Sequence, residues 1–176
     1  NKLLWRDESV DGVKTGHTDS AGFCLISSAQ RNDMRLIAVV SGSESEDERL
    51  IASQRLLEYG FRFYATQKLV SQETKVTSAK VWGGKTNEVA LGSTKDIYLT
   101  LPRSEFKNIK ANYQFNDNLQ APIEIGQMIG SIEFTSNDRV VLSSPLVAIE
   151  TVEAKGFFGM LWARLVYWIT SLFSFG

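Results

Sequence analysis

Residues 10–18 decide how the first part of this chain folds, and they read Val10-Asp11-Gly12-Val13-Lys14-Thr15-Gly16-His17-Thr18. We predict a strand over 13–18, because turn-forming residues follow directly and two further strand-like runs, 23–29 and 34–40, come next. Short runs joined by about four polar residues are typical of an antiparallel meander. The third run is almost continuously apolar, which predicts a strand buried on both faces.

An amphipathic helix is predicted over 46–64. Ser45 with Glu48 three residues later forms a capping box, and three acids in the first turn suit the positive end of the helix dipole. Apolar residues then recur near helical spacing at Leu50, Leu57, Phe61 and Tyr64.

Residues 67–152 have a different pattern, in which alternation replaces helical spacing. All three prolines lie here, and the runs 97–101, 110–115, 128–135 and 140–142 are rich in strand-forming residues and separated by turns. Several short strands spaced by turns predict a small all-β sandwich or barrel. The fold class expected for the whole chain is therefore α+β.

The composition excludes several classes of protein. The 176 residues include 19 basic and 20 acidic side chains, which excludes nucleic-acid binding through a global positive field. One cysteine excludes an internal disulfide framework, and one cysteine with one histidine excludes a Cys/His zinc site built from this chain alone. No metal site and no cofactor are expected. A mean hydropathy of −0.12 excludes a protein with several membrane spans.

The run Lys14-Thr15-Gly16 carries the sharpest chemical signal. On a strand, alternate residues share a face, so Lys14 and Gly16 are expected to point the same way. A lysine there supplies positive charge for an anion near a nucleophile, Thr15 offers a hydroxyl to a carboxylate, and Gly16 leaves room for a substrate backbone. The tripeptide alone occurs by chance in roughly one chain in twenty-five of this length.

Beyond the tripeptide, the chain resembles the D-alanyl-D-alanine carboxypeptidases, which are low-molecular-mass penicillin-binding proteins of the 5/6 type. The matching stretches, in one order along essentially the whole chain, are 1–5, 10–18, 21–22, 34–37, 60–63, 96–100, 119–122 and 157–159. The resemblance implies a serine peptidase that removes the terminal D-Ala from peptidoglycan pentapeptides through an acyl-enzyme and is inhibited by β-lactams. It implies a catalytic domain that ends with this strand, two more strands and a helix, followed by a β-rich domain and an amphipathic helix.

The resemblance also implies which residues meet the substrate. The substrate-binding candidates are Lys14, Thr15, Gly16, His17, Thr18 and Arg49. For Arg49 the alternative is a surface partner of Ser45 or of nearby acids on the helix. Thr18 either borders the same pocket or lies outside it. In the family, the S-x-x-K and S-x-N motifs come before K-T-G, and only thirteen residues precede Lys14 in this sequence. The one S-x-x-K string, Ser104-Glu105-Phe106-Lys107, comes after K-T-G and has no S-x-N partner, so we interpret it as a chance match.

The tail, 156–176, is aromatic and almost uncharged. Three interpretations compete: a helix lying on a membrane surface, which we favour, a membrane-spanning helix, and a core helix. Arg164 would be costly at the centre of a bilayer, and a narrow small or polar stripe runs along the helix. The candidate anchor residues are Phe157, Phe158, Trp162, Arg164, Trp168 and Phe173.

These observations predict three parts: 1–66 as the end of a penicillin-binding, β-lactamase-like catalytic domain, 67–152 as a β-rich domain, and 153–176 as a membrane-anchor helix. The chain starts at Asn1 rather than Met, so we expect a processed or truncated piece that is inactive alone. The expected partners are peptidoglycan pentapeptide, β-lactams and the periplasmic face of the bacterial inner membrane, with no nucleic acid. The alternatives are a non-catalytic, membrane-tethered scaffold that binds cell wall or protein, and a secreted β-lactamase relative.

Overall fold

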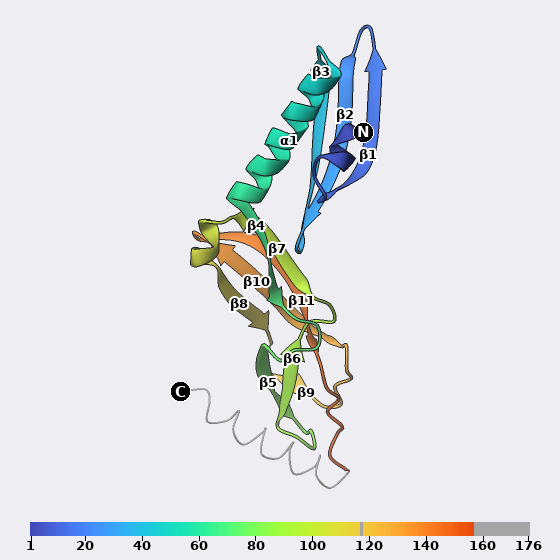
Figure 1. The fold of residues 1–176 in the computed structure, drawn as a ribbon. Coiled ribbons are helices and arrows are strands. Elements are labelled where there is room, and N and C mark those ends of the chain that lie inside the picture. The colour runs from blue at the N-terminus through green and yellow to red at the C-terminus, as the bar shows by residue number, and fades with distance from the viewer. Residues whose placement is uncertain (117, 157–176) are drawn as a thin grey trace. The chain divides into compact units, whose positions relative to one another are not determined.

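The computed structural model describes residues 1–116 and 118–156, and these residues form two compact units (Figure 1). Unit 1 comprises Asn1–Gln67 and Thr100–Phe106, and unit 2 begins with Lys68–Leu99 and continues from Lys107. The described part of the chain is mostly β and contains one α-helix. The predicted anchor residues from Phe157 onward lie outside the described residues.

Unit 1 contains a three-stranded antiparallel sheet in the order β1-β2-β3, as the meander prediction requires. The strands are β1 (Val10–Thr18), β2 (Gly22–Arg31) and β3 (Met34–Ser43). A short 3-10 helix, η1 (Lys2–Trp5), precedes them. Because β1 lies at one edge of this sheet, it pairs only with β2 among the described strands. The Lys14-Thr15-Gly16 run is therefore on an edge strand.

Helix α1, Glu46–Phe63, follows β3 and lies along one face of the sheet (Figure 1). The Ser45 side chain accepts a hydrogen bond from the Glu48 amide at 3.1 Å, which confirms the predicted cap. The Glu48 carboxylate reaches back to the amide of Glu44 at 2.7 Å, one residue beyond the partner that a capping box uses. The helix ends at Phe63, because Tyr64 turns to extended backbone with its N–H still bonded to Gly60.

The core of unit 1 lies between α1 and the covered face of the sheet. Its buried residues are Leu3, Val10, Leu25, Ala29, Met34, Ala38, Leu50, Leu57 and Phe61. The prediction that the third strand is buried on both faces is wrong in this structure: Ile37 and Val39 are 66% and 65% exposed on the other face of β3. An apolar run therefore does not require two covered faces.

Unit 2 is built on a six-stranded sheet in the order β8-β10-β11-β6-β5-β9, in which only the β5–β9 pair is parallel. The strands of this sheet are β5 (Thr77–Trp82), β6 (Glu88–Gly92), β8 (Lys110–Phe115), β9 (Leu119–Gln120), β10 (Met128–Ser136) and β11 (Arg139–Ala148). The β10–β11 turn uses Asn137 and Asp138 in the left-handed region, as expected for a tight hairpin.

A two-stranded sheet pairs β4, Tyr64–Val70, with β7, Ile97–Pro102, and the boundary between the units falls within these strands. The predicted alternation of 97–101 is confirmed, since Ile97 and Leu99 are buried and Tyr98 is exposed. The core of unit 2 takes Val70 and Ile97 from this sheet and Ile132 and Leu146 from the larger one. Both sheets therefore contribute side chains to the core of unit 2.

A second 3-10 helix, η2, Glu105–Asn108, follows β7. Within 1–116 and 118–156, no helix combines the length and the apolar composition that crossing a bilayer demands.

Candidate functional site

Five of the predicted site residues lie on the edge strand β1, from Lys14 to Thr18. Cross-strand partners share a face of a sheet, so the pairing shows how these side chains divide. Lys14 pairs with Ile26, which in turn pairs with Val39, and these two are exposed on the face that α1 does not cover. Lys14 therefore lies on the uncovered face and is exposed, and alternation places Gly16 on that face too.

Thr15 and His17 lie on the opposite, helix-covered face. Thr15 pairs with the buried Leu25, and His17 pairs with Phe23, with the two ring centroids 4.1 Å apart. Thr18 ends the strand, and its hydroxyl accepts a hydrogen bond from the amide of Ala21 at 3.0 Å, inside the β1–β2 turn. The strand thus presents Lys14 and Gly16 to one side, and Thr15 and His17 to the other.

Arg49 lies in the first turn of α1, and its side chain contacts strand β1. Its Nη1 group donates to the carbonyl oxygen of Gly16 at 3.2 Å and to that of Cys24 at 3.4 Å. Its guanidinium also lies 5.4 Å from the centre of the Phe23 ring, and the residue is only 7% exposed. Arg49 does pair with an acid of its own helix, Glu46, but it is not the surface residue that the alternative interpretation describes.

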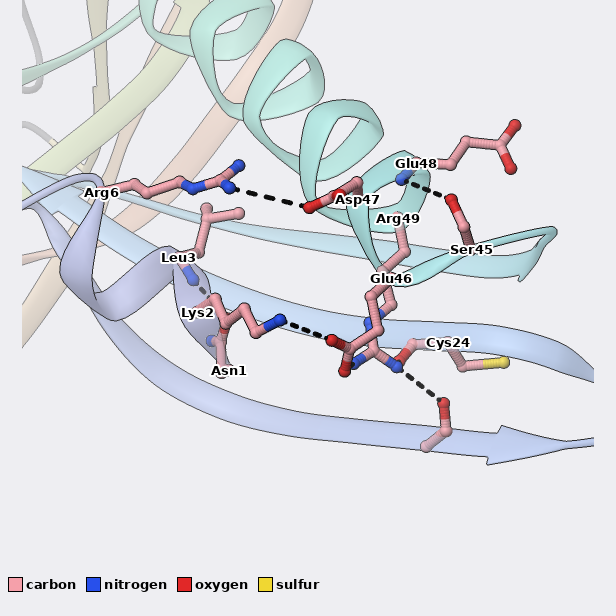
Figure 2. Close-up of polar contacts among 11 residues, drawn as sticks. Asn1, Lys2, Leu3, Arg6, Cys24, Ser45, Glu46, Asp47, Glu48 and Arg49 are labelled. Carbon is pink, nitrogen blue, oxygen red and sulfur yellow. Dashed lines mark hydrogen bonds and ion pairs between the residues drawn. The ribbon is translucent and has the colours of Figure 1, made fainter.

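Glu46 is the main site feature that the sequence analysis missed. One carboxylate oxygen accepts from Arg49 Nη2 at 2.8 Å, and the other accepts from Lys2 Nζ at 2.7 Å (Figure 2). The Lys2 hydrogen bond is the largest cause that lowers the pKa of Glu46, and the charges of Lys2 and Arg49 act in the same direction. The i,i+3 spacing of Glu46 and Arg49 on a predicted helix could have indicated that the two side chains pair. No local pattern indicates the contact between Lys2 and Glu46, which are 44 positions apart.

The remaining motif candidates lie elsewhere. Ser104 follows β7, and Lys107 is on η2, so the Ser104–Lys107 string is on neither β1 nor α1. In the part of the chain that the structure describes, no group of three or more His, Cys, Asp or Glu side chains is arranged to hold a metal ion.

Comparisons with known proteins agree with this architecture in both parts of the chain. The family described as "Penicillin-binding protein 5, C-terminal domain" matches residues 64–154, and the family described as "D-alanyl-D-alanine carboxypeptidase" matches residues 1–45. The chain belongs to the penicillin-binding protein 5 family of D-alanyl-D-alanine carboxypeptidases. Residues 10–18, with the Lys14-Thr15-Gly16 run, lie inside the second of these matches.

Individual members of the penicillin-binding protein 5 family match over almost the whole chain. D-alanyl-D-alanine carboxypeptidase DacC of Escherichia coli (strain K12) is 39% identical over 180 residues, covering 99% of this chain and 45% of the relative. DacA of the same strain is 39% identical over 163 residues, covering 92% of this chain and 40% of the relative. The solved structure of penicillin binding protein 5 from Haemophilus influenzae is similar with a TM-score of 0.74 and 36% identity, over 86% of this chain and 45% of that one. The chain therefore spans less than half the length of these relatives.

Proposed function

We propose that this chain is the C-terminal part of a penicillin-sensitive, serine-type carboxypeptidase that trims the terminal D-Ala from peptidoglycan pentapeptides. The observation that carries the proposal is the Lys14-Thr15-Gly16 run on an exposed edge strand in a member of this family. An edge strand has free backbone donors and acceptors, so an extended peptide can lie along it as an added strand. Such a peptide would meet side chains from both faces of β1.

In this proposal, the exposed Lys14 provides positive charge on the uncovered face, where it would stabilise an anion formed at the reacting carbonyl. Gly16 leaves the strand edge open, because a Cβ built there has only the Cys24 Cβ near it, at 3.9 Å. Thr15 and His17 would meet the substrate from the helix side, and Arg49 would add positive charge for its terminal carboxylate. Thr18 would border the end of the pocket.

The nucleophile is not in this sequence. It contains no S-x-N string, and its one S-x-x-K string, Ser104–Lys107, comes after K-T-G. The proposal therefore assigns 1–66 to the end of a catalytic domain whose serine and base lie upstream, and 67–152 to a β-rich second domain. It follows that the 176-residue chain alone should not release D-Ala.

Labelling with a fluorescent penicillin tests this function in the longer protein that includes the upstream segment. The wild type should be acylated, and Lys14→Ala should lower the acylation rate constant about 100-fold, the effect of removing one electrostatic stabiliser. Lys80→Ala is the matched control, because Lys80 is an exposed lysine in unit 2. Equal labelling of Lys14→Ala and Lys80→Ala would reject the role of Lys14, and an unlabelled wild type would reject the enzyme in favour of a scaffold.

We also propose that 153–176 attaches the protein to the periplasmic face of the inner membrane. The support is compositional: the anchor candidates are Phe157, Phe158, Trp162, Arg164, Trp168 and Phe173, and aromatic side chains favour the headgroup region. In flotation with vesicles containing anionic lipid, the 176-residue chain should rise with the vesicles, and a variant lacking 156–176 should remain below. Flotation of the truncated variant would contradict the anchor.

A further inference from the structure

The strand that carries Lys14-Thr15-Gly16 is paired with one neighbouring strand, β2. β1 pairs on one side only among the described strands, and Gly16 has no side chain to pack against its neighbours. The Arg49 Nη1 group therefore provides the contact that ties this point of β1 to the helix, through the Gly16 carbonyl at 3.2 Å. The same group reaches the Cys24 carbonyl at 3.4 Å, so it joins β1 and β2 where Gly16 and Cys24 pair.

Both bonds from Nη1 are long, and arginine is a flexible side chain that needs a second anchor to stay in one place. Glu46 supplies that anchor through the 2.8 Å bond to Nη2, which fixes the plane of the guanidinium (Figure 2). Lys2 occupies the other carboxylate oxygen at 2.7 Å, so the carboxylate is itself held from η1. The result is a chain of contacts from Lys2 through Glu46 and Arg49 to Gly16.

We propose that Glu46 and Lys2 are positioning residues, which hold Arg49 on the Gly16 carbonyl and thereby keep the Lys14–Gly16 strand in its reactive position. This inference rests on the proposed function of that strand. The proposed role differs from a general effect of acids at a helix start. Three acids occupy the first turn of α1, and among them Glu46 is the one whose carboxylate pairs with the Arg49 guanidinium. The Lys2 hydrogen bond is the largest cause that lowers the pKa of Glu46, so the same contact that holds the carboxylate also favours its ionised form.

The neighbouring Asp47 supplies a matched control. It is in the same turn, carries the same charge, and pairs with another cation of the N-terminal segment, Arg6, at 3.7 Å (Figure 2). Asp47→Asn and Glu46→Gln therefore make the same change in charge and in the helix dipole, and only Glu46→Gln removes the charge that pairs with Arg49. Lys2→Met is a second test, because it removes the outer contact and leaves Glu46 in place.

The experiment uses the longer protein with its upstream segment, and it measures kcat and KM for a peptide ending in D-Ala-D-Ala together with the penicillin acylation rate. Glu46→Gln should lower kcat and the acylation rate about 10-fold with KM changed less than twofold, because the strand is displaced from its productive position. Lys2→Met should lower the same rates about threefold, and Asp47→Asn should match the wild type.

A second readout comes from hydrogen exchange of the β1 amides in the 176-residue chain, which should speed up in Glu46→Gln and not in Asp47→Asn. Equal behaviour of Glu46→Gln and Asp47→Asn, or a change in KM alone, would overturn the positioning role. A wild-type protein that neither releases D-Ala nor binds penicillin would instead overturn the proposed function. The two failures are thus distinguishable.

Discussion

Replacement of Arg49 by methionine should loosen the β1–β2 pair by an amount that the contacts allow us to work out. The two hydrogen bonds from Nη1, at 3.2 and 3.4 Å, are charge-assisted but long. We assign about 1.5 kcal/mol to each, the lower end for a charged donor, and hence about 3 kcal/mol to both. The ion pair with Glu46 adds less than about 1 kcal/mol, because the Glu46 side chain is 45% exposed to solvent.

One contribution acts in the opposite direction. The Nε of Arg49 is buried and has no hydrogen-bond partner, which costs the native state about 1–2 kcal/mol. Methionine removes that cost and fills a similar space with an unbranched, adaptable side chain. The net loss is therefore about 2 kcal/mol, which corresponds to a factor of about 30 in the equilibrium for local opening.

Hydrogen exchange measured by mass spectrometry on the 176-residue chain gives this number directly. In Arg49→Met, amides of β1 and the facing part of β2 should exchange about 30-fold faster, and amides of unit 2 should be unchanged. Arg55→Met is the control, because Arg55 is an exposed arginine on the same helix. The reasoning is refuted if β1 exchange in Arg49→Met stays within about twofold of the wild type, or if Arg55→Met has the same effect.

Two further predictions concern stability. Asp7→Asn should destabilise the chain to urea at pH 7, and this cost should shrink as the pH falls. The Ser9 hydrogen bonds chiefly, and Arg31, lower the pKa of Asp7 below its unfolded value, so the contribution of the carboxylate is present above about pH 4 and is lost as the pH falls through the folded-state pKa. Gly130→Ala should destabilise unit 2 by about 1–3 kcal/mol and lower its melting temperature, because the new Cβ would lie 2.0 Å from the backbone oxygen of Gln114.

Controls distinguish these effects from general damage. An Asp7→Asn cost that persists at low pH would show that the charge of the carboxylate is not responsible. Gly156→Ala places a Cβ with no atom of the described residues within 4 Å and should leave the melting temperature unchanged. If Gly130→Ala melts at the same temperature as Gly156→Ala, the close approach of β8 and β10 does not constrain that position.

Local signals predicted much of the fold. The Ser45 cap located the start of α1 because the hydrogen bond that stops fraying is made within four residues. The alternation at 97–101 predicted which side chains of β7 are buried, since a strand exposes every second residue to one side. The boundaries of β8 were predicted correctly for the same reason.

Contacts between distant residues were beyond the same reasoning. The order β8-β10-β11-β6-β5-β9 and the parallel β5–β9 pair depend on which strands meet in space, and no local pattern encodes that. Likewise, the local motif was enough to identify Lys14 and Thr15 as site candidates. Only the structure shows that Arg49 is buried, donates to the Gly16 carbonyl, and is linked through Glu46 to Lys2. The apolar run of β3 was misinterpreted because composition does not say whether a second layer covers Ile37 and Val39.

The proposed carboxypeptidase activity is best measured as the release of D-Ala from a peptidoglycan pentapeptide by the longer protein that carries this chain at its C-terminus. We expect release of the terminal D-Ala by the wild type, inhibition by penicillin, and a loss of about 100-fold in kcat/KM in Lys14→Ala. Release that is insensitive to penicillin, or that proceeds equally fast in Lys14→Ala, would contradict it.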